Sequence, residues 1–125
     1  MALEPRTPGP EHPISVEPSR DRVVVRVGEA VVAESSRAVV LRESTYPAVY
    51  YLPAEDVDWT TLRSSATSTY CPYKGEAAYY DAVTDEGVTA DAAWSYPEPY
   101  PAVGEIAGRL AFYPDRTRIS VEAAS

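Results

Sequence analysis

Short apolar segments, many of them alternating with polar positions, run along most of the chain and are separated by turn residues. This pattern is typical of β-strands rather than of amphipathic helices. The connections between the segments are short, so the pattern predicts a mainly β fold. We expect strands over residues 14–16, 22–27, 30–35, 38–43, 49–52, 67–71, 76–83, 88–94, 110–112 and 118–122.

One segment, 53–62, is predicted to be helical, for about two turns. Pro53 stands at its entry, and Glu55 and Asp56 lie in its first turn, where the helix dipole favours acids. Val57, Trp59 and Leu62 are expected to anchor this helix to the body of the protein.

Turn residues predict two of the hairpins. Gly28-Glu29 is a two-residue turn of the Gly-X kind, which pairs 22–27 with 30–35. The turn at 113–117 predicts a last hairpin between 110–112 and 118–122.

A third hairpin is centred on Cys71-Pro72-Tyr73-Lys74-Gly75, which holds the single cysteine and the single lysine. Pro72 and Gly75 fit a type I turn closed by a bulge. Lysine beside a thiol can activate it as a nucleophile or redox centre. Cys71 has no histidine base and no second cysteine nearby in the sequence, so we interpret it as an inert thiol and predict no catalytic residue.

The length of 125 residues is that of one domain, and four prolines mark residues 1–13 as an extended arm. We therefore expect an arm over 1–13 and a single domain over 14–125. The net charge of −8 and the pI of about 4.6 argue against nucleic acid and anionic membranes as partners. A monomer or a weak homodimer is expected.

The lone cysteine indicates a reducing compartment, so a cytoplasmic location is predicted, and neither a signal peptide nor a membrane-spanning run is expected. One cysteine cannot form a zinc site, and the single histidine, His12, lies in the arm. We expect no histidine in the body for a metal cluster or a catalytic triad, and no metal or cofactor.

Tyrosine dominates the aromatic residues, with ten Tyr against two Trp and one Phe. Tyrosine suits walls that are apolar on one side and polar on the other. Adjacent tyrosines on a strand point to opposite faces, so one member of each pair 50–51 and 79–80 could line a cleft for a planar or cationic small molecule. The other interpretation is that the rings belong to the core. The candidate ligand-binding residues are Arg26, Glu43, Tyr50, Tyr51, Cys71, Lys74, Tyr79, Trp94 and Tyr96.

Arg26 and Lys74 have alternative interpretations. Lys74 either contacts a ligand near a cleft or is an ordinary surface lysine. Arg26 shares a strand face with Val24, so partial burial and a structural ion pair with an acid such as Glu43 are expected; the alternative is an anion clamp in a cleft. Glu43 ends a strand near Tyr46 and is a candidate polar group of a pocket.

Several blocks carry a more specific signal, in this order: His12-Pro13-Ile14, Arg22–Val27, Tyr50-Tyr51-Leu52-Pro53-Ala54-Glu55-Asp56-Val57, Thr69-Tyr70-Cys71-Pro72-Tyr73-Lys74-Gly75-Glu76-Ala77-Ala78-Tyr79-Tyr80, Ala93-Trp94-Ser95-Tyr96-Pro97 and Leu110-Ala111-Phe112-Tyr113. Together they resemble the bacterial domain of unknown function 427 family over nearly all of residues 12–122. The resemblance implies a β-tent fold, in which two antiparallel sheets meet at a steep angle around a ligand-sized cleft.

Similar folds are those of the thalidomide-binding domain of cereblon and of methionine sulfoxide reductase B. Those relatives hold a structural zinc through cysteines, which this chain cannot do. Some family members are labelled nucleotidyltransferases, but the chain has no phosphate loop and no paired acids after a Gly-Ser turn.

The favoured hypothesis is a small-molecule-binding domain with an aromatic cleft between two sheets. The alternatives are an enzyme that uses Cys71 in redox or acyl-transfer chemistry, and a protein-interaction module.

Overall fold

The computed structural model describes residues 6–124, and it confirms the mainly β class. Its strands are β1 (Ile14–Pro18), β2 (Arg22–Val27), β3 (Ala30–Ser35), β4 (Val39–Glu43), β5 (Val49–Tyr51), β6 (Leu62–Cys71), β7 (Gly75–Thr84), β8 (Gly87–Ser95), β9 (Leu110–Phe112) and β10 (Arg118–Glu122). Helical structure in this part of the chain is limited to the 3₁₀ segments η1 (Ala54–Asp56), η2 (Trp59–Thr61) and η3 (Pro101–Ile106).

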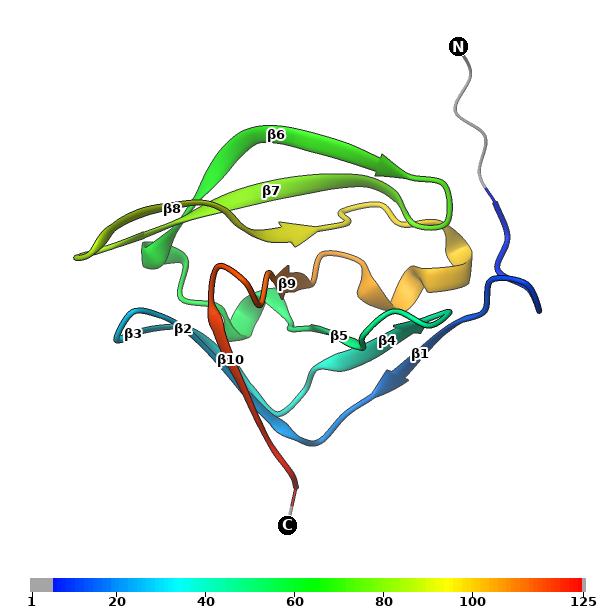
Figure 1. Cartoon of the computed structure of the whole chain (residues 1–125), viewed down its shortest axis with the longest axis horizontal. Coiled ribbons are helices and arrows are strands. Elements are labelled where there is room, and N and C mark those ends of the chain that lie inside the picture. The colour runs from blue at the N-terminus through cyan, green and yellow to red at the C-terminus, as the bar shows by residue number, and fades with distance from the viewer. Residues whose placement is uncertain (1–5, 125) are drawn as a thin grey trace.

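The strands form two layers (Figure 1). One layer is a four-stranded antiparallel sheet in the order β6-β7-β8-β9. The other consists of two three-stranded sheets, β1-β4-β5 and β10-β2-β3, which slope toward each other and meet where β1 passes into β2. The expected second sheet is therefore split in two.

The two layers are joined at one edge, where the residue that follows β5 pairs with the first residue of β9. Leu52 and Leu110 exchange both backbone hydrogen bonds, at N···O distances of 2.7 and 2.8 Å. Both leucines are only 1% exposed. This junction fixes how Tyr50 and Tyr51 face the strands of the opposite layer.

The predicted helix over 53–62 is two separate 3₁₀ turns, because Val57 between them is extended. Val57 forms a β-bridge with Ala33, which takes it out of the helical region. Asp58 then starts the second turn, since its side chain accepts a hydrogen bond from the backbone N–H of Thr60. Trp59 is 43% exposed, so it anchors these turns only at the surface.

The prediction of a last hairpin is wrong, although both of its strands exist. β9 pairs with β8, whereas β10 crosses to the other layer and pairs with β2, with Ile119 opposite Val25. The turn at 113–117 closes on the Tyr113 carbonyl, which accepts from the backbone N–H groups of Arg116 and Thr117. This crossing places β10 beside β2, where Ile119 and Val121 form one wall of the larger cavity described below.

Apolar side chains between the layers form two buried clusters. One is centred on Val23, Val25 and Leu52, and the other on Leu41 and Tyr51. The sequence patterns did not predict η3, whose Val103 and Ile106 are fully buried in the second cluster. No helix among the described residues has the length and hydropathy to cross a membrane.

Candidate functional site

A buried ion pair lies at the centre of the site. Lys74 is in the turn between β6 and β7 and is only 8% exposed, and Glu43 is the last residue of β4. The Lys74 Nζ donates to Glu43 Oε1 at 2.5 Å. Both charges lose water when such a pair is buried, and this loss costs free energy. Further hydrogen bonds to Lys74 and Glu43 are needed to offset it.

The turn that presents Lys74 has the predicted geometry. The Lys74 backbone N–H donates to the Cys71 carbonyl at 3.2 Å, and the Lys74 carbonyl accepts from Tyr100 N–H at 3.0 Å. Gly75 has a φ of +111°, which side-chain-bearing residues rarely adopt. The hairpin thus holds the lysine against the interior rather than in solvent.

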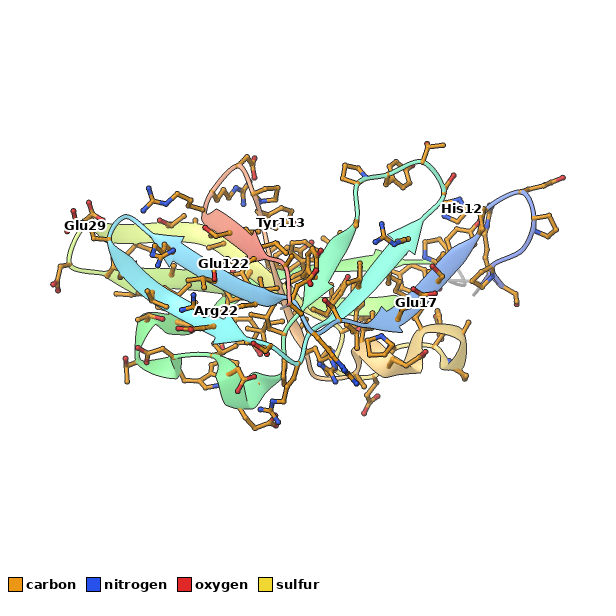
Figure 2. The ribbon with its side chains drawn as sticks, turned by 90° about the horizontal axis from the view of Figure 1, so that it is seen from below. His12, Glu17, Arg22, Glu29, Tyr113 and Glu122 are labelled. Carbon is orange, nitrogen blue, oxygen red and sulfur yellow. The ribbon has the colours of Figure 1, made fainter. Side chains whose placement is uncertain are left out.

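His12 completes this polar network, contrary to the expectation that no histidine reaches the body of the protein. Its Nε2 lies 2.7 Å from Glu43 Oε2, and its ring stacks on Tyr73 at a centroid distance of 4.1 Å. The arm brings His12 next to Glu43 because β1 pairs with β4, with Ile14 opposite Glu43. Figure 2 shows His12 just beyond the start of β1. Residues 1–5 of the predicted arm lie outside the described residues.

The network keeps Glu43 ionised. Burial alone would raise the pKa of its carboxyl, but the hydrogen bonds from Lys74 and His12 outweigh burial and lower that pKa. Both carboxylate oxygens are therefore occupied by protein donors at neutral pH.

A cavity of about 200 Å³, which we call the polar compartment, opens beside the ion pair. Six of the nine candidate residues line it: Glu43, Tyr51, Lys74, Tyr79, Trp94 and Tyr96. The fold thus brings together candidate residues from β4, β5, β7, β8, the turn before β7 and the loop after β8. Tyr113, which was predicted only as a turn residue, lines it as well.

Hydrogen bonds and ring contacts order the aromatic wall. Trp94 Nε1 donates to the Tyr51 hydroxyl at 3.2 Å, and the Tyr113 hydroxyl donates to that of Tyr79 at 3.3 Å. The Trp94 and Tyr113 rings lie 4.4 Å apart. Figure 2 shows Tyr113 next to the strands from which the wall is built.

The phenols of this wall act as hydrogen-bond donors at physiological pH. Burial raises the pKa of Tyr51, Tyr96 and Tyr113 well above the ordinary tyrosine value. Their hydroxyls therefore stay protonated and neutral.

A second cavity of about 460 Å³, the apolar compartment, adjoins the first. Both compartments are lined by Tyr46, Pro47, Val49 and Trp94, so these four residues form the boundary between them. Its remaining wall is almost entirely hydrocarbon, with Val23 and Val25 of β2, Phe112 of β9, and Ile119 and Val121 of β10 as major parts.

The sequence could not reveal this second compartment, because it depends on β10 crossing to β2. Tyr50 lines it, whereas its neighbour Tyr51 lines the polar compartment. Tyr79 likewise faces the polar compartment, and Tyr80 packs on Trp59 at a centroid distance of 5.4 Å.

Two candidates lie outside both compartments. Arg26 lines a shallow recess with Arg116 and Arg118, at the far end of β2. The expected ion pair between Arg26 and Glu43 is wrong, because Glu43 pairs with Lys74 and His12. Cys71 lies beneath the turn, with its Sγ 3.9 Å from Lys74 Nζ.

The fold and the site define a mainly β domain with a two-compartment cavity between its layers. The family model of the domain of unknown function 427 (DUF427) matches residues 15–123, so the chain belongs to this family. No curated protein matches the chain.

Proposed function

We propose that this protein binds a small molecule whose apolar body occupies the apolar compartment and whose polar end reaches the polar compartment. The observation that carries the proposal is that the two cavities adjoin and share Tyr46, Pro47, Val49 and Trp94 as lining residues. Their volumes, about 460 and 200 Å³, lie in the range of ligand sites when taken together.

The composition of the walls supports a small molecule over a protein partner. The apolar surface is concave and lies between the layers, whereas a protein-interaction module would present its apolar side chains on an outer face. The lone, partly buried thiol of Cys71 is compatible with a reducing compartment. We therefore propose that the protein is cytoplasmic and binds its ligand there.

A neutral, environment-sensitive dye tests this function. Nile red emission should rise on addition of the protein, and Ala48→Trp should weaken its binding at least about tenfold, because the indole fills the mouth of the apolar compartment. Ala48 is exposed, so the change avoids the core.

Ala66→Trp is the matched control, since Ala66 is an exposed position on β6 that lines neither compartment. It should leave dye binding unchanged. Equal binding by the wild-type protein and Ala48→Trp would refute binding in this cavity.

A second candidate, chemistry at Cys71, is favoured only by the contact of its thiol with Lys74. The same ammonium is paired with Glu43 at a much shorter distance, which weakens its effect on the thiol. Binding without covalent chemistry is therefore the function we propose.

A further inference from the structure

The chemistry of the bound molecule can be read from the hydrogen-bond balance of the polar compartment; this inference rests on the proposed function. Tyr96 lines the compartment and is only 7% exposed. Its backbone carbonyl accepts from the Gly108 N–H, but its hydroxyl forms no hydrogen bond with any residue in the range 6–124. No fully enclosed side-chain polar atom of the described residues lacks a partner, so the Tyr96 hydroxyl is not sealed in the core, and the polar compartment is the cavity that Tyr96 lines. The hydrogen of this hydroxyl has no acceptor among the described residues.

Two further donors lie in the same compartment. The Tyr51 oxygen accepts from Trp94 Nε1, but its own O–H hydrogen has no acceptor within the described part of the chain. The Lys74 ammonium has three hydrogens, of which Glu43 takes one and the Cys71 sulfur, at 3.9 Å, is at most a weak acceptor for another.

The only carboxylate of the compartment and the Tyr79 oxygen, in contrast, are occupied. Glu43 receives Lys74 on one carboxylate oxygen and His12 on the other. The Tyr79 oxygen receives the Tyr113 hydroxyl. The remaining acceptors of the compartment are the neutral phenol oxygens of Tyr96 and Tyr113, whereas its spare donors include the Lys74 ammonium, so the compartment is complementary to an acceptor group such as a carbonyl oxygen.

Charge decides which carbonyl compound fits. The Lys74 charge is cancelled by Glu43, so an added carboxylate would meet the Glu43 carboxylate without a free cation to offset it. An added ammonium would lie beside the Lys74 ammonium and would find no free carboxylate, only neutral phenol oxygens. A neutral carbonyl meets neither penalty.

We propose that the polar compartment binds the carbonyl oxygen of a neutral amide or ester, with Tyr96, Tyr51 and Lys74 as its donors. The hydrocarbon part of the molecule passes the Trp94 boundary and lies against Val25 and Ile119 in the apolar compartment. The ligand class is thus an uncharged, mostly apolar carbonyl compound, rather than a fatty acid or an amine.

A matched series of octanamide, octanoate and octylamine tests the head group by displacement of Nile red at pH 7.5. The three probes share one chain length and differ in charge at the head. Octanamide should displace the dye at least about tenfold more effectively than either charged probe, because a charged head would lie in the compartment without a counter-ion.

Variants that lose one hydroxyl test the donors. Tyr96→Phe should weaken octanamide binding about 2- to 10-fold, and Tyr51→Phe should do so to a similar degree. Tyr80→Phe is the control, because Tyr80 lies on the other face of β7 and should leave binding unchanged. Melting temperatures establish that each variant is folded. Because Tyr96→Phe and Tyr51→Phe each remove a different hydroxyl, the test does not depend on a single substitution.

The outcomes separate this inference from the proposed function. If the three probes bind equally and neither Tyr variant weakens octanamide, the carbonyl assignment is refuted, although dye binding that is sensitive to Ala48→Trp still supports the cavity. If the wild-type protein binds neither Nile red nor octanamide, the proposed function is refuted together with the inference.

Discussion

Replacing Lys74 by Met removes the cation of the buried ion pair while keeping a side chain of similar length. Lys74 and Glu43 have side-chain exposures of only 10% and 14%, so the remaining carboxylate is left with little water around it. Removal of one member of a buried pair costs about 3–5 kcal/mol. His12 still donates to Glu43, which places the expected loss near the lower limit, at about 3 kcal/mol.

Protonation of Glu43 sets an upper bound on this cost. Neutralising a carboxyl costs about 1.4 kcal/mol for each pH unit above its ordinary pKa, and hence about 4 kcal/mol at pH 7. In a domain of 125 residues a loss of 3 kcal/mol lowers the melting temperature by about 10 °C.

Urea denaturation of Lys74→Met, Glu43→Gln and the double variant at pH 7 measures the pair directly. The double variant should be more stable than Lys74→Met, with a coupling of about 2 kcal/mol, since it no longer contains the uncompensated charge. Arg63→Met is the surface control: its pair with Asp81 is at 3.3 Å and its side chain is 59% exposed, so the loss should stay below about 1 kcal/mol.

The stability difference between wild type and Glu43→Gln should also depend on pH. The pKa of Glu43 is lowered in the folded state, so its contribution is complete above the unfolded value of about 4.3 and is lost as the pH falls through the lower folded value. Equal losses for Lys74→Met and Arg63→Met, or a difference that stays constant from pH 7 to pH 3, would refute this account of the pair.

Three other predictions concern the elements around the pair. His12→Ala should destabilise the fold by about 1–2 kcal/mol, because it removes the Glu43 hydrogen bond and the stacking on Tyr73; an unchanged urea midpoint would contradict this. Gly75→Ala should cost about 1–3 kcal/mol, because φ is +111°, whereas Gly104→Ala, with open space around its added Cβ, should be nearly neutral in the same assay. Cys71 should react with iodoacetamide at pH 7.5 no faster than glutathione, since Glu43 offsets the Lys74 charge; a faster reaction would favour the enzyme hypothesis.

The sequence was sufficient for features set by local chemistry. The Pro72–Gly75 turn and the alternation of Tyr79 and Tyr80 follow from turn preferences and the two-residue period of a strand, whereas the burial of Lys74 does not. Glu43 was identified because it ends a strand.

Features that depend on long-range pairing could not be predicted. His12 reaches Glu43 only because Ile14 pairs with Glu43, about thirty residues along the chain. The apolar compartment forms only because Ile119 pairs opposite Val25, and no local sequence pattern predicts that β10 pairs with β2 rather than with β9. The prediction of a helix over 53–62 was wrong for the same reason, since the bridge of Val57 to Ala33 is a tertiary contact.

A crystal structure of the protein with octanamide would test the central claim most directly. We predict that the carbonyl oxygen lies within hydrogen-bond distance of the Tyr96 hydroxyl and that the alkyl chain passes Trp94 to contact Val25 and Ile119. Octanamide bound on an outer face of the sheets, with both compartments empty, would contradict the account.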